Sequence, residues 1–114
     1  MGKATECVVA YPARLPSGAP TQFNLEYYLN THMPLIDKYW GPYGLEGWEV
    51  SKGLEDDGIE CRYIIQATLH FESMQGLVAA LAASETKMTR ADISNYTNVK
   101  PDIWVLKEFA RNTV

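Results

Sequence analysis

The chain has 114 residues, 46% hydrophobic and 21% charged, so we expect residues 1–114 to form one domain with a core of its own. Its formal net charge is −4, and 10 Lys and Arg residues are scattered among 14 acidic ones. Proteins that bind nucleic acid or membrane surfaces need a basic stripe, so this balance argues against both partners.

No segment of the sequence predicts membrane insertion or export. The longest apolar run, Leu77–Ala83, is far shorter than the roughly 20 residues that span a bilayer. The first residues lack the long apolar stretch of a signal peptide. Cys7 and Cys61 lie in strand-like runs without metal-ligand spacing, so we expect two buried free thiols in a cytoplasmic protein.

The first third of the chain predicts a strand and a helix. Thr5–Tyr11 is β-prone, and the Pro and Gly residues after it indicate a surface loop. From Asn24, a favourable N-cap, to Trp40, apolar residues recur every three or four positions, as in an amphipathic helix. Pro34 has no N–H for the Asn30 carbonyl, so we expect a kink or break near His32. The predicted buried stripe is Leu25, Tyr28, Leu29, His32, Met33, Ile36, Tyr39 and Trp40.

A hairpin, a second helix and a last strand follow. Leu45–Gly53 and Ile59–Phe71 are strand-like, and the Asp57-Gly58 pair between them indicates a turn. The second of these strands alternates between two faces, and we expect Tyr63 on the face that packs under the helices. Ser73 is the predicted N-cap of a helix with a buried stripe of Met74, Leu77, Val78 and Leu81; one or two helical turns then lie within Ser84–Asn95, and Asp102–Phe109 is the last strand.

The predicted order is βαββαβ. Its compact solution is an α+β ferredoxin-like sandwich, a four-stranded antiparallel sheet with both helices on one face. The first and last strands carry apolar residues on both faces, and a sheet facing water would be more polar there. We therefore expect the open sheet faces of two copies to pack together as a homodimer.

His32 is the residue that bears most directly on chemistry. It lies on the apolar stripe of the first helix, and an imidazole titrates near neutral pH, so it can give or take a proton. The alternative is a core histidine bonded to a main-chain oxygen. Tyr28 lies one turn earlier on the same face and either holds the imidazole, offers its hydroxyl to a ligand, or packs in the core. Asp92 either orients His32 or caps a short helix.

Aromatic side chains are numerous enough to line a pocket for a flat or apolar molecule, and Tyr63, Trp40 and Trp104 are the candidates; plain core packing is the alternative. No dinucleotide, phosphate-loop or metalloprotease motif occurs. His70 is too far along the chain from His32 to indicate a metal site, so we expect neither a metal nor another cofactor.

The stretch Phe23–Leu35, with its Tyr27-Tyr28-x-x-x-His32-x-Pro34-Leu35 spacing, resembles the signature of the EthD family. Gly47–Gly53, Asp92–Tyr96 and Pro101–Phe109 also resemble that family. The resemblance implies a dimeric α/β barrel, in which two ferredoxin-like sheets face each other, with a ligand cleft between helices and sheet. It carries over His32 and, more weakly, Tyr28 and Asp92.

The EthD family is linked to bacterial breakdown of ethyl tert-butyl ether beside an oxygenase system, and its superfamily includes cofactor-free monooxygenases, cyclases and isomerases. The resemblance thus implies a small-molecule pocket protein. One hypothesis is an oxidoreductase-, isomerase- or cyclase-type enzyme for an apolar or aromatic metabolite, with His32 as acid or base. The second is a non-catalytic binding or accessory protein for an oxygenase pathway, and the third is a purely structural dimer.

Overall fold

The computed structural model describes residues 5–55 and 60–113. The predicted Asp57-Gly58 turn and the first residue of the predicted third strand, Ile59, lie outside them. The elements in chain order are β1 (Thr5–Pro12), α1 (Leu25–Tyr27), the π-helical turn η1 (Tyr28–His32), α2 (Met33–Trp40), the 3₁₀ turn η2 (Gly41–Tyr43), β2 (Leu45–Lys52), β3 (Tyr63–Phe71), α3 (Met74–Ala82), α4 (Thr86–Asp92), the 3₁₀ turn η3 (Ile93–Asn95) and β4 (Asp102–Lys107).

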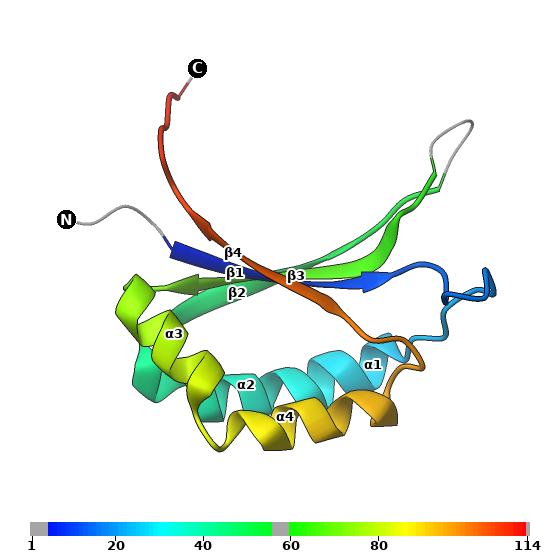
Figure 1. Ribbon diagram of the computed structural model, residues 1–114, viewed down its shortest axis with the longest axis horizontal. Coiled ribbons are helices and arrows are strands. Elements are labelled where there is room, and N and C mark those ends of the chain that lie inside the picture. Colours follow the sequence, from blue (N-terminus) through cyan, green and yellow to red (C-terminus); the bar gives the residue numbers. More distant parts are fainter. Residues whose placement is uncertain (1–4, 56–59, 114) are drawn as a thin grey trace.

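The four strands form one antiparallel sheet in the order β2-β3-β1-β4. All helices cover the same face of this sheet, as Figure 1 shows. The predicted α+β ferredoxin-like architecture is therefore confirmed. No helix of the described residues lies on the opposite sheet face, and the chain after β4 and the strand ends of the β2–β3 hairpin curve away from the helices on that side.

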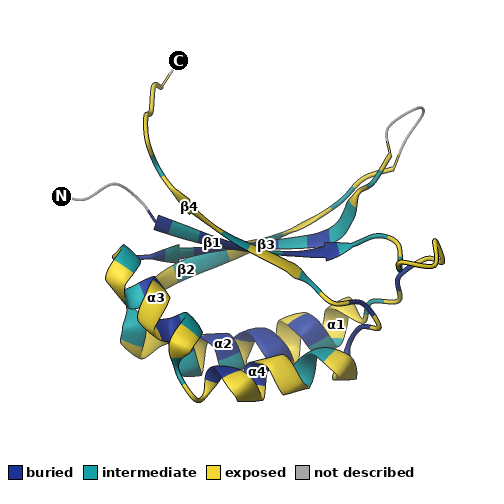
Figure 2. Cartoon of the chain, in the orientation of Figure 1, coloured by how far each residue is buried: buried dark blue, intermediate teal, exposed yellow. Residues whose placement is uncertain are grey.

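The core lies between the helices and the covered sheet face (Figure 2). Alternation along β3 buries Ile65, Ala67, Leu69 and Phe71, as predicted. In α3 Leu77 is buried as predicted, but the prediction for Val78 is wrong: its side chain is exposed, and Ala80 faces the core. The reason is that positions 77 and 80, one turn apart, already fill the narrow face that α3 turns to the sheet.

Pro34 shapes the first helix where an interruption was expected. The N–H of Met33 bonds to the carbonyl of Tyr28, five residues back, and this forms the π-helical turn η1. Such a turn widens the helix by one residue, and it often marks functional sites. Tyr28 and His32 both face the core, whereas Leu25 and Leu29, predicted to be buried, are exposed.

The β1–β3 register corrects the placement of Tyr63. Tyr11 pairs with Ile65 but Pro12 pairs with Tyr63, so the register shifts and Ile64 is bypassed. A bulge of this kind places residues 63 and 65, which would otherwise share a face, on opposite faces of the sheet. Tyr63 accordingly lies on the open face, where its hydroxyl donates to Asp102 Oδ2 at 3.2 Å. Among the described residues β3 begins at Tyr63, so residues 60–62 of the predicted strand lie outside it; Cys61 is half-buried, which corrects its prediction, whereas Cys7 is fully buried as predicted.

Candidate functional site

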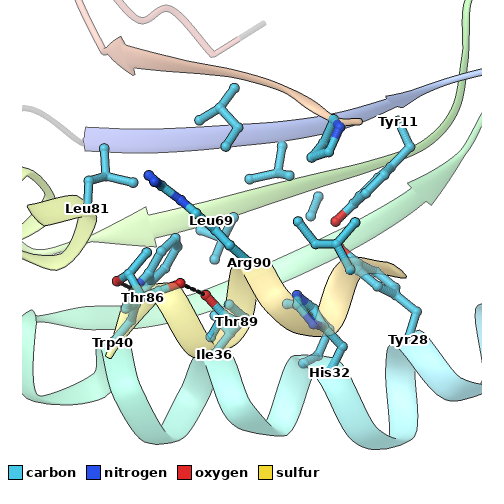
Figure 3. Close-up of a pocket in the computed structure, with 16 residues that line it drawn as sticks. Tyr11, Tyr28, His32, Ile36, Trp40, Leu69, Leu81, Thr86, Thr89 and Arg90 are labelled. Carbon is cyan, nitrogen blue, oxygen red and sulfur yellow. Dashed lines mark hydrogen bonds between the residues drawn. The ribbon is translucent and has the colours of Figure 1, made fainter. Parts of the chain in front are cut away.

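A cavity of about 50 Å³ lies between η1, α2, α4 and the covered sheet face (Figure 3). A volume of this size holds several water molecules or a small chemical group, so a ring-sized ligand enters it fully only when lining side chains move apart. Most of its wall is apolar, and it includes Val9, Met33, Ile36, Leu69, Leu81 and Ile93. His32 rises from its helix into this wall and is only 4% exposed. The cavity thus presents an imidazole to a largely apolar space.

Asp92 holds one side of the His32 ring. Its Oδ2 lies 3.0 Å from His32 Nδ1, while its Oδ1 accepts hydrogen bonds from the Tyr27 hydroxyl at 2.6 Å and from Asn95 Nδ2 at 3.0 Å. An ionised carboxylate can only accept, so Nδ1 carries the proton and Nε2 keeps its lone pair. The carboxylate makes no capping bond to the following 3₁₀ turn, so of the two alternatives for Asp92 the geometry has it orienting His32.

The other side of the ring meets a chain of tyrosines. The hydroxyl of Tyr96 lies 3.4 Å from His32 Nε2 and 2.6 Å from the hydroxyl of Tyr11. The first distance is longer than an ordinary hydrogen bond, so Nε2 is only weakly engaged. The ring of Tyr28 stacks on the imidazole, with centroids 5.5 Å apart and planes 14° apart. Tyr28 therefore fixes the ring by packing.

The electrostatics keep His32 neutral and Asp92 charged. Burial lowers the pKa of His32 below its ordinary value, although the hydrogen bond and charge of Asp92 act in the opposite direction. Burial alone would raise the pKa of Asp92, but hydrogen bonds from Tyr27, Asn95 and His32 outweigh it and hold that pKa below its usual range. At neutral pH the site thus contains an imidazole base beside an ionised carboxylate.

The predicted pocket aromatics are divided between the two faces of the sheet. Trp40 lines the cavity, and its Nε1 donates to Thr86 Oγ1 at 3.0 Å. Trp104 and Tyr63 do not line it: their rings lie 5.9 Å apart on the open face, because Trp104 pairs with Val8 and not with the cavity-lining Val9. The structure brings His32, Tyr28, Asp92 and Trp40 together and leaves Tyr63 and Trp104 apart from them.

Several site residues were not singled out from the sequence. Tyr27, Asn95 and Tyr96 bond to Asp92 or His32, and Tyr11 extends the chain of hydroxyls. The sequence contains one signal for Tyr27. It belongs to a tyrosine pair just before the Pro34 interruption, and a π-helical turn there changes which side chains share a face of the helix. Tyr11 lies 85 positions from Tyr96, and only the folded sheet joins them.

Within residues 5–55 and 60–113, no three His, Cys, Asp or Glu side chains gather as metal ligands do. Among the same residues, no helix is both long and apolar enough to cross a bilayer.

Neither protein-family models nor curated proteins match this chain. Solved structures do match it over nearly its whole length. An EthD-like protein from Ralstonia eutropha superposes with a TM-score of 0.79 at 22% identity, covering 99% of this chain and 98% of that chain. An ethyl tert-butyl ether D (EthD) family protein from Bacillus halodurans gives 0.66 at 18% identity, covering 94% and 99%. A conserved protein from Methanosarcina mazei gives 0.61 at 14% identity, covering 94% of each chain. This chain therefore has the fold of EthD-like proteins, in agreement with the resemblance that Phe23–Leu35 carries.

Proposed function

We propose that this chain binds an apolar or aromatic small molecule in the cavity beside His32 and that His32 is the acid–base group of an enzyme. The observation that carries the proposal is a buried imidazole that lines an apolar cavity and is held through Nδ1 by an ionised Asp92. EthD-like neighbours share the fold, and the resemblance of Phe23–Leu35 to their family agrees with a small-molecule ligand.

The arrangement suits proton transfer. A neutral Nε2 accepts a proton from a bound molecule, and the resulting imidazolium is stabilised by the Asp92 carboxylate at Nδ1. The long contact from Tyr96 leaves Nε2 open to a ligand in the cavity. A proton transfer of this kind can serve isomerase, cyclase or cofactor-free oxidoreductase reactions. The bound substrate therefore determines which reaction follows.

A non-catalytic binding or accessory protein is the second candidate. The observation that favours it is that each buried side-chain N and O atom among the described residues already has a partner within the protein. A ligand can therefore be held by apolar contacts alone, because the polar side chains of the protein do not require hydrogen bonds from it. Binding without turnover, with His32 affecting affinity only, distinguishes this candidate from the enzyme.

Binding in the cavity is tested with two neutral aromatic probes, indole and 4-bromobenzamide, by NMR of the methyl groups of Ile36 and Leu81. We expect saturable shifts of these methyls in the wild type. Ala67→Val adds two carbon atoms at the cavity wall and should weaken binding, whereas Val78→Ala on the exposed side of α3 should not. Shifts confined to other residues, or unaffected by Ala67→Val, contradict the proposal.

Once a substrate is found, His32→Gln distinguishes the enzyme from the binding protein. A general acid or base contributes roughly 10²- to 10⁴-fold in rate, so kcat should fall by that factor with folding unchanged. An unchanged kcat removes His32 from the chemistry.

We also propose that two copies pair through the open sheet face. Support comes from Trp104 and Leu106 on that face, since alternate residues of β4 share a face and Leu106 is 48% exposed. The curvature of the strands around this face agrees with a partner seated there. Trp104→Arg should convert a dimer to a monomer in light scattering, whereas Val78→Arg should leave it dimeric. A monomeric wild type at micromolar concentration refutes the pairing.

A further inference from the structure

The wall of the cavity contains one permanently charged side chain, that of Arg90 on α4. In Figure 3 this side chain extends from α4 toward the sheet. The ion pairs among the described residues join His32 to Asp92, His70 to Glu49 and Arg111 to Glu108, so none of them uses Arg90. Within residues 5–55 and 60–113, the Arg90 guanidinium therefore has no ion-pair partner, and it lies at the edge of an apolar space.

A second, larger hollow adjoins the cavity on the side of Arg90. Its volume is about 680 Å³, and it shares Arg90, Ile93, Pro101 and Ile103 with the cavity wall. Lys100 also lines it, and no Asp or Glu occurs among the described residues of its lining. The lining of this hollow is therefore positively charged, whereas the whole chain has a net charge of −4. The region next to the apolar cavity is thus suited to a negative group.

We propose that the ligand of this site is an amphipathic anion, with an apolar or aromatic body in the cavity beside His32 and a carboxylate-like group bound by Arg90. The inference rests on the proposed function, and it adds the chemical class of the ligand. A guanidinium has a planar fork of donors that matches a carboxylate in two parallel hydrogen bonds. Lys100, in the outer hollow, adds a second positive charge to the field that attracts the anion.

Arg90 also lies in the last turn of α4, where a cation stabilises the helix by its interaction with the C-terminal end of the helix dipole. That role accounts for the residue without any ligand. It predicts that loss of the charge lowers the melting temperature but does not change which ligands bind. Ligand selectivity therefore distinguishes the two roles: only the anion-binding role predicts that loss of Arg90 changes the preference for a charged over a neutral ligand.

The test uses 4-bromobenzoate and 4-bromobenzamide, which share the ring and the bromine and differ in charge. Binding to the whole chain is measured by calorimetry. We expect the wild type to bind the benzoate about tenfold more tightly, which corresponds to about 1.4 kcal/mol. Arg90→Gln should abolish this preference and leave the affinity for the amide within about twofold. Lys87→Gln removes a charge from the same helix outside the cavity wall and should retain the preference.

The outcomes distinguish this inference from the proposed function. If both probes bind equally and Arg90→Gln changes neither affinity, the anion specificity is refuted and the cavity remains a ligand site. If Arg90→Gln lowers the melting temperature and both affinities alike, the role of Arg90 is structural and the inference fails. If neither probe binds the wild type, the proposed function fails and this inference fails with it.

Discussion

Asp92→Asn tests how the site sets the proton on His32. In the wild type, Oδ1 of Asp92 accepts from Tyr27 and Asn95, and Oδ2 accepts from His32 Nδ1. In the variant, the amide oxygen keeps the first two donors because they approach the same atom. The amide nitrogen then faces His32, and as a donor it requires Nδ1 to accept. The proton should therefore move to Nε2, the atom beside the Tyr96 hydroxyl.

The stability change follows from the same contacts. Hydrogen bonds to a charged group contribute about 1.5–3 kcal/mol, and neutral ones about 0.5–1.5 kcal/mol. The variant keeps the geometry and loses the charge, so the free energy of unfolding should fall by about 1–2 kcal/mol. Asp92→Ala should cost more, because it leaves the buried Nδ1 of His32 without a partner.

The assay is ¹⁵N NMR of the His32 ring, which distinguishes the two neutral tautomers, together with urea unfolding. The wild type should show the Nδ1–H form and Asp92→Asn the Nε2–H form. The substitution should also abolish any activity that requires Nε2 as a base. If the tautomer is the same in both proteins and the stability changes by less than about 0.5 kcal/mol, Asp92 does not orient the ring.

Two further predictions concern protonation and packing around the cavity. Since the pKa of His32 is lowered in the folded state, the unfolded chain takes up a proton first as the pH falls below about 6.5, and stability should decline by up to about 1.4 kcal/mol per pH unit. Urea unfolding between about pH 7 and pH 5 should show this decline in the wild type and in His70→Gln but not in His32→Gln; a parallel decline in His32→Gln contradicts the assignment. Thr86→Val removes the acceptor of Trp40 Nε1 and the donor to the Ala80 carbonyl, so it should cost about 2–3 kcal/mol of unfolding free energy; a cost below about 0.5 kcal/mol would show that Trp40 is not held by this bond.

The architecture and the buried position of His32 could both be predicted from the sequence because they depend on local patterns of residues. Apolar periodicity places His32 on a buried face, and the missing N–H of Pro34 predicts an interruption within the same turn. For Asp92 the sequence left two roles open, orienting His32 or capping a short helix. A residue before a 3₁₀ turn can cap it or bond elsewhere, and the choice depends on how α4 packs on α2.

Other features depend on contacts that no local pattern records. Tyr63 lies on the open face because of a register shift. Strict alternation along β3 instead predicts that it lies on the face covered by the helices. The contact between Tyr11 and Tyr96 exists only once β1 and the end of η3 are adjacent. Arg90 is exposed on a short helix, where charged residues are ordinary, and its relevance appears only from the cavity beside it.

The most direct test of the account is a crystal structure of the protein soaked with 4-bromobenzoate, with the bromine located by its anomalous scattering. We expect a bromine peak in the cavity, in contact with Ile36 and Leu69 and beside the ring of His32. A bound probe whose bromine lies elsewhere, or a cavity filled by the protein's own side chains, would contradict it.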